Sequence, residues 1–164
     1  MKCQAAQGDE FGFVGGLLAA GLRVGEASAR ENLKRAINPT ELANSLQYGY
    51  SQATITATDA SLVHVAGQVG MSEDGPNDFE SQVDRSFDAL LATLDVAGTS
   101  ADNVVKCTLL IAEYDAEKLA YMVENRKAVF GDNPPASTLI PVPALYAPGV
   151  LFEIDAVAVA PRSN

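Results

Sequence analysis

The sequence predicts an α+β fold in which one sheet carries two helices on one face. Two segments place apolar residues at helical spacing, several short segments are rich in β-branched residues, and the two kinds alternate along the chain. The resulting order, β-β-α-β-α-β-β, is typical of helices layered on a single sheet. The 164 residues, 48% hydrophobic and 20% charged, are enough for one folded domain.

The first two strands are expected at 52–57 and 62–66. Both segments are short and β-prone, and the turn-forming residues 58–61 between them predict a hairpin. The following segment, 72–77, contains Gly75-Pro76, which indicates a loop.

Two helices follow, each with a capping residue and a stop signal. The first is expected to begin after Asp78 and to end before Gly98, and the second to begin after Asp115 and to end at Gly131. The apolar residues that carry the helical spacing are Phe79, Val83, Phe87, Leu90, Leu91 and Leu94 in the first helix and Leu119, Met122, Val123 and Phe130 in the second.

Three further strands are predicted at 104–112, 136–142 and 150–159. In 104–112, four of nine residues are β-branched, which favours a largely buried strand. In 150–159, period two places Phe152, Ile154, Ala156 and Ala158 on one face, and Leu151, Glu153, Asp155, Val157 and Val159 on the other. We expect the first face to lie under the helices. Because three of the five residues on the second face are apolar, we expect another subunit to cover it.

The composition excludes several classes of function. The net charge of −10, from 11 basic and 21 acidic residues, disfavours nucleic acid as a partner. One histidine, His64, and two cysteines, Cys3 and Cys107, are too few for a His-rich metal site or a CxxC zinc site, so we expect no metal site of either kind. A Ser–His–Asp hydrolase is improbable for the same reason. We interpret His64 as structural and Cys107 as buried and inert.

The cellular location follows from the same composition. No apolar run approaches the length of about 18 residues that a membrane span needs, so no membrane partner is expected. Two cysteines fit a reducing compartment, and we expect a soluble, cytoplasmic protein.

Residues 1–33 differ in composition from the rest. Six of the 13 glycines fall in the first 25 residues, where each weakens a helix by about 1 kcal/mol relative to alanine. Asp9 and Glu10 precede the apolar stretch and break the order of regions in a signal peptide. We therefore expect 1–33 to be a mobile extension and 35–161 to form the domain.

The order of elements and several segments resemble the RidA family, also called the YjgF or L-PSP family. The resemblance covers about 35–161, roughly three quarters of the chain, and no counterpart exists in it for 1–33. The matching segments are YGYSQA at 48–53, VAGQV at 65–69, AG at 97–98, VVKCT at 104–108, PAST at 135–138 and FEIDAVAV at 152–159.

This resemblance implies a chorismate-mutase-like α+β fold with a mixed sheet, assembled as a homotrimer whose sheets form a central barrel. It also implies a small-molecule ligand in a cleft at each subunit interface. Active members hydrolyse reactive enamines and imines, such as 2-aminoacrylate, to a 2-oxo acid and ammonia without a metal or cofactor. A cation holds the substrate carboxylate, and a carboxylate orients the attacking water.

The family's functional positions map onto particular residues here. The water-orienting glutamate falls on Glu153, for which the alternative is a rim salt bridge. The aromatic of the substrate site falls on Tyr50, which could instead serve packing alone. The backbone of Gly67 and Gln68 matches the segment that lines the cleft, unless the strand end merely requires a glycine.

The chain departs from the family where active deaminases carry Pro-Ala-Arg followed by Ser or Thr. Here Ser137 stands in place of the substrate-binding arginine, followed by Thr138. Both residues are candidates for substrate binding, or for ordinary hydrogen bonding at a strand edge. Arg85 and Arg126 lie on predicted helices and are expected to face away from the cleft.

Two functions follow. The first is a cofactor-free hydrolase or deaminase of small imine or enamine metabolites with altered substrate anchoring, and Glu153 favours it. The alternative is a non-catalytic trimeric small-molecule-binding protein, which the missing arginine at Ser137 favours. Ribonuclease activity, an older label of the family, is disfavoured by the acidic charge.

Overall fold

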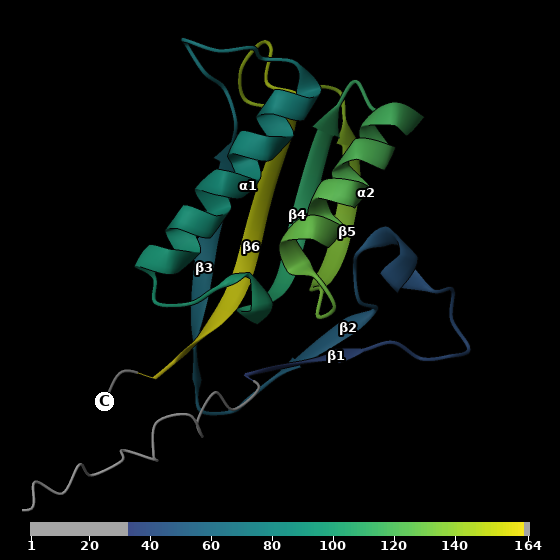
Figure 1. The fold of residues 1–164 in the computed structure, drawn as a ribbon, viewed down its shortest axis with the longest axis vertical. Coiled ribbons are helices and arrows are strands. Elements are labelled where there is room, and N and C mark those ends of the chain that lie inside the picture. The colour runs from purple at the N-terminus through teal and green to yellow at the C-terminus, as the bar shows by residue number, and fades with distance from the viewer. Residues whose placement is uncertain (1–32, 163–164) are drawn as a thin grey trace, which may run out of the picture. The chain divides into compact units, whose positions relative to one another are not determined.

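Four strands and two helices make up two layers in the part of the chain that the computed structural model describes, residues 33–162 (Figure 1). Their bounds are β3 Ala60–Val69, α1 Phe79–Val96, β4 Val104–Ala112, α2 Ala116–Phe130, β5 Ala136–Val142 and β6 Phe152–Pro161. The strands form one sheet in the order β3-β6-β4-β5, and both helices lie on the same face of it. The predicted α+β fold is confirmed. Apart from Leu33, the predicted extension lies outside the described residues.

The sheet is mixed, as predicted. β6 runs antiparallel to β3 and β4, whereas β4 and β5 run parallel, with α2 as the crossover between them. In this register Cys107 of β4 lies between Ser137 of β5 and Ala156 of β6, and Leu110 of β4 lies opposite Glu153 of β6. These pairings determine which candidate residues share a face of the sheet.

The helices begin and end where the capping signals predict. The Asp78 carboxylate accepts a hydrogen bond of 2.9 Å from the amide three residues further on, and Asp115 accepts the equivalent bond of 2.8 Å. These backbone bonds lower the pKa of both carboxyl groups. α2 ends at Gly131, whose φ of 54° suits a residue without a side chain.

The core fills the space between the helices and the sheet. The ring centroid of Phe87 on α1 lies 6.0 Å from those of Phe130 and Phe152. The predicted alternation along β6 is confirmed, because Phe152, Ile154, Ala156 and Ala158 are at most 2% exposed, whereas Glu153, Asp155 and Val157 are half-buried. Val159, predicted on the second face, is fully buried, and Thr99 donates 2.6 Å to its carbonyl.

The predicted hairpin between the first two strands is wrong. The strand β2, Ala53–Thr56, pairs antiparallel with a strand that was not predicted, β1, Lys34–Ile37, while β3 pairs with β6. A long-range contact explains this choice, because the buried Lys34 ammonium donates to the carbonyls of Val104, at 2.8 Å, and Asn133, at 2.6 Å. The turn signal at 58–61 is local and carries no information about that contact.

No described element covers the face of the sheet opposite the helices, which we call the open face. The strand register assigns to it His64 from β3, Lys106, Thr108 and Leu110 from β4, Thr138 and Ile140 from β5, and Glu153, Asp155 and Val157 from β6. As predicted, this face mixes apolar and charged side chains.

Candidate functional site

The structure separates the predicted site residues into two groups on opposite faces of the sheet. Ser137 is paired with Cys107, and Glu153 is paired with Leu110, three positions further along β4. Because neighbouring positions of a strand alternate between faces, an odd separation places Ser137 on the helix face and Glu153 on the open face. Within one chain, the two groups do not meet.

On the open face, the Glu153 carboxylate lies directly over the backbone of Gly67. A Cβ atom added to Gly67 would lie 1.8 Å from Oε1 of Glu153. A side chain at position 67 would displace the carboxylate end of Glu153, so the glycine permits this close approach. The structure therefore brings together two of the predicted site residues.

A β-bulge shapes the strand beside this carboxylate. Val65 and Gln68 pair with Ala156 and Ile154, so two residues of β3, 66 and 67, lie opposite one residue of β6. The side-chain amide of Gln68 donates 2.9 Å to the carbonyl of residue 66, within the bulge. Bulges remove backbone groups from the regular ladder and are frequent next to active sites.

Glu153 forms no ion pair within residues 33–162. The salt bridges there join Lys118 to Asp115 and Lys127 to Glu124, both on the surface of α2 or at its start. The rim salt bridge, the alternative interpretation of Glu153, is thus not formed within the described part of a single chain. A half-buried carboxylate without a cationic partner remains available as a proton acceptor.

On the helix face, Arg126 occupies the space beside Ser137. Its Nη1 donates 3.0 Å to Oγ of Ser137, its Nη2 donates to the carbonyl of Tyr48, and the guanidinium lies 5.3 Å from the centroid of the Tyr50 ring. The expectation that Arg126 faces away from the site residues is wrong. It follows Met122 by four positions and so belongs to the buried stripe of α2.

Cys107 completes the helix-face group. Its thiol is fully buried and lies 3.4 Å from Oγ of Ser137. Burial raises the pKa of the Cys107 thiol, which therefore stays protonated at neutral pH. The interpretation of Cys107 as a buried residue is confirmed.

Thr138 lies on the open face with a cation that the sequence did not single out for this position. The Lys106 ammonium donates to Oγ1 of Thr138 and, at 3.2 Å, to the carbonyl of Cys107. Arg85 donates instead to the carbonyls of Gly70, at 2.6 Å, and Pro76, at 2.7 Å. Lys106 and Arg126 each donate a hydrogen bond to a predicted site residue on β5.

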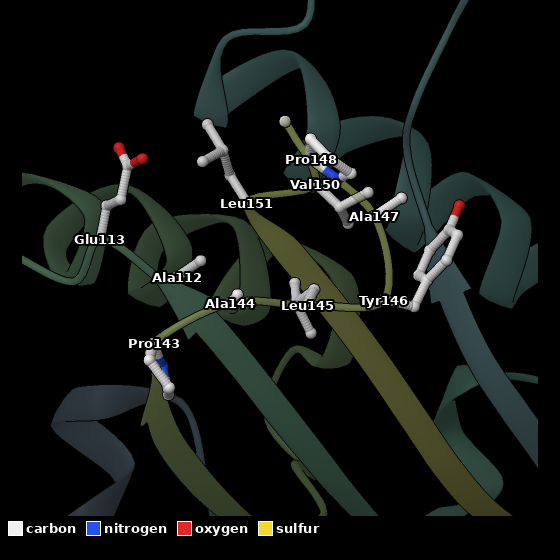
Figure 2. Close-up of a pocket in the computed structure, with 11 residues that line it drawn as sticks. Ala112, Glu113, Pro143, Ala144, Leu145, Tyr146, Ala147, Pro148, Val150 and Leu151 are labelled. Carbon is white, nitrogen blue, oxygen red and sulfur yellow. The ribbon is translucent and has the colours of Figure 1, made fainter.

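A separate cavity of about 350 Å³ lies at the end of β4 (Figure 2). It is enclosed by residues 112–113 and the loop 143–151, and Figure 2 shows Glu113 at one side of this loop and Tyr146 at the other. Glu113 is the one charged residue in its lining. No predicted site residue lines the cavity, although the loop leads directly into the strand that carries Glu153.

The described residues contain neither a cluster of metal-ligating side chains nor a helix that could span a membrane. Between residues 33 and 162, no three histidine, cysteine, aspartate or glutamate side chains are grouped so that they could hold a metal ion. In the same part of the chain, neither helix has the length and apolar composition needed to cross a membrane.

Comparison with known proteins gives consistent matches. The model of the family described as "Endoribonuclease L-PSP" matches residues 40–160. The RutC family protein YjgH of Escherichia coli (strain K12) is 34% identical over 103 residues, which are 62% of this chain and 77% of that protein.

The solved structures agree. The Rid family protein YyfB from Yersinia pestis has a TM-score of 0.72 and 29% identity, over 77% of this chain and 98% of the other. Rv2704 from Mycobacterium tuberculosis, a member of the YjgF/YER057c/UK114 family, has a TM-score of 0.53 and 26% identity, over 76% and 98%. The matched region contains both groups of candidate residues.

Proposed function

The chain belongs to the endoribonuclease L-PSP family, and on this premise we propose that it is a cofactor-free hydrolase of small reactive imines or enamines. The observation that carries the proposal is the Glu153 carboxylate, which lies over Gly67 on the open face and forms no ion pair within the described residues. Such a carboxylate can accept a hydrogen bond from a water and orient it.

The proposed reaction needs one proton acceptor and no external oxidant. The oxygen of a water forms a bond to the imine carbon while Glu153 takes one of its protons, and the C=N bond becomes single. Glu153 then returns the proton to nitrogen. The hydroxyl proton of this intermediate then passes through Glu153 to the nitrogen, and the C–N bond breaks as the C=O bond forms, which releases ammonia and a carbonyl compound. An enamine enters the same route after protonation at carbon gives the imine.

We further propose that the site is completed in a homotrimer. Ser137 belongs to β5 and Gly67 to β3, and these are the two edge strands of the sheet. If the β5 edge of one copy meets the β3 edge of the next, the helix-face group of one subunit approaches Glu153 of its neighbour. The apolar residues of the open face, such as Leu110 and Ile140, support burial against other copies.

Ammonia release tests the hydrolase. Imines are generated in situ by an amino-acid oxidase, and the rate is compared with spontaneous hydrolysis. Because a positioned acid–base group contributes roughly 10²–10⁴-fold, Glu153→Gln should reduce the catalysed rate to near the spontaneous one. Asp155→Asn is the matched control, since Asp155 lies two residues further on the same face and should retain most activity.

The alternative, a non-catalytic binding protein, is favoured by Ser137, which replaces the family arginine. It predicts ligand binding without ammonia release above the spontaneous rate. Equal rates for the unmodified protein, Glu153→Gln and the buffer would decide for this alternative. RNA cleavage is a weaker candidate because of the net charge of −10, and titration with RNA at low salt tests it.

A further inference from the structure

Arg126 is a buried cation with neutral neighbours. The residue is 4% exposed, and its contacts are the Ser137 hydroxyl, the Tyr48 carbonyl and the Tyr50 ring. Its Nε is buried and has no hydrogen-bond acceptor. Within residues 33–162, no carboxylate forms a salt bridge with it.

This arrangement is unusual because a guanidinium does not lose its proton in proteins. A buried charge normally has an ion of opposite sign as its partner, since neutral groups replace lost hydration incompletely. Burial also lowers the pKa of Arg126, which reflects the same desolvation. The site therefore contains an unbalanced positive charge and one buried nitrogen, Nε, without a hydrogen-bond acceptor.

The surroundings suit a small planar anion. The Nε and Nη2 groups form one side of the guanidinium fork, which matches the two oxygens of a carboxylate, and the Tyr48 carbonyl is the one acceptor on that side. Tyr48 belongs to the single helical turn Ser45–Tyr48, and its side chain is 48% exposed. A carboxylate that binds both Nε and Nη2 would take the place of this carbonyl.

We propose that Arg126, from α2, supplies the cation that binds the carboxylate of the ligand in this chain. Tyr50 packs on the face of the guanidinium and Ser137 holds its Nη1, which fixes the plane of the fork. The class of anion rests on the proposed function, whereas the anion site itself rests on the unpaired guanidinium. The cation thus comes from α2 in this chain, whereas active members of the family supply it from the strand. The ligand is an anion in both cases.

Pyruvate binding to the full chain tests the site, with pyruvamide as the neutral probe of the same shape. Isothermal titration should detect binding of pyruvate and not of pyruvamide. Arg126→Gln should weaken pyruvate binding roughly ten- to a hundredfold, the effect of one charge-assisted contact. Lys106→Met, which removes the cation beside Thr138, should leave it unchanged. Equal binding of the two probes, or loss in Lys106→Met instead, would overturn the proposal.

A charge-swap variant separates binding from folding. Arg126→Ser removes contacts to Ser137 and Tyr48 and could destabilise the chain for that reason alone. Combining it with Ser137→Arg returns a guanidinium to the same space from β5. The swap should recover pyruvate binding to within about tenfold of the unmodified protein. Circular dichroism reports folding of each variant. If the double variant is folded and does not bind pyruvate, the proposal is contradicted. The preference of the unmodified protein for pyruvate over pyruvamide tests the proposal without any variant.

The hydrolase and the anion site can each be disproved without the other. Glu153→Gln should lose ammonia release and keep pyruvate binding, because Glu153 is proposed to orient the water and Arg126 to hold the carboxylate. If no variant changes ammonia release but Arg126→Gln abolishes pyruvate binding, the hydrolase fails and the anion site stands. If pyruvate does not bind and imines are still hydrolysed, the anion site fails and the hydrolase stands.

Discussion

At the scale of single residues, Gly67 fixes the place that the Glu153 carboxylate can occupy. A methyl group at position 67 would overlap Oε1, which is 1.8 Å from the ideal Cβ. The carboxylate would have to rotate away, which costs little stability because it is the far end of a flexible side chain.

We therefore predict that Gly67→Ala loses ammonia release almost as completely as Glu153→Gln while the chain stays folded. Gly75→Ala is the matched control, because the Cβ added there would lie 3.4 Å from the nearest atom, an ordinary contact. The comparison is made by ammonia release together with thermal unfolding. Full activity in a folded Gly67→Ala protein would show that the position of this carboxylate does not matter.

At the scale of elements, Lys34 attaches the β1–β2 pair to the main sheet through its bonds to Val104 and Asn133. Burial lowers the pKa of Lys34 from 10.5 to about 8. Between these two values the unfolded chain holds a proton that the folded chain has released. The free energy of unfolding should therefore rise as pH increases from about 8 to 10.5. Below pH 8 this gain is absent, because the buried amine is charged in the folded chain as well.

The prediction is measured by urea unfolding at pH 7.5 and pH 10, on the unmodified protein and on Lys34→Met. The free energy of unfolding of the unmodified protein, relative to Lys34→Met, should be larger at the higher pH. Lys127→Met, which removes an exposed lysine, is the control. The difference in free energy of unfolding between the unmodified protein and this variant should be the same at both pH values. A constant difference between the unmodified protein and Lys34→Met would mean that Lys34 titrates normally.

The elements differ in how far the sequence predicts them. Both helices were predicted with their caps because Asp78 and Asp115 bond to amides only three residues away. The strand β4 was predicted with its observed bounds from its β-branched content. β1 escaped prediction because two of its four residues, Lys34 and Arg35, are charged, and its place depends on contacts far away in the sequence.

The candidate site shows the same division. Alternation along β6 correctly placed Glu153 opposite the helix-covered face, since period two is a local property. Arg126 was assigned to the wrong side because an arginine on a helix is normally solvent-exposed. Its position in the stripe with Met122 and Phe130 was the available signal. Its contacts to Tyr50 and Ser137 join segments that are distant in the chain, and no spacing reveals them.

At the scale of the whole molecule, the open face predicts the oligomeric state. Leu62 is 58% exposed and Ile140 is 42% exposed, and Leu110 lies beside Ile140 in the register. Exposed apolar residues on an uncovered sheet face are expected to be covered by other copies. From the family resemblance, we predict three copies per particle by light scattering. Leu110→Glu, which adds a charge next to Glu153, should shift the particle toward a monomer.

Val96→Glu is the matched control for that measurement. Val96 is 90% exposed at the end of α1, on the opposite side of the sheet from the open face, so its charge should leave the particle mass unchanged. A stable monomer of the unmodified protein at micromolar concentration would contradict the trimer.

Subunit complementation tests most directly whether one subunit supplies Arg126 and its neighbour supplies Glu153. Arg126→Gln and Glu153→Gln proteins are unfolded together, refolded as a 1:1 mixture and assayed for ammonia release from 2-iminopropanoate. Each variant alone should be inactive. The mixture should recover about one quarter of the unmodified activity, because random assembly in a ring with head-to-tail interfaces pairs an intact arginine with an intact glutamate in about one site of four. No recovery in a folded, mixed oligomer would contradict a site shared between subunits.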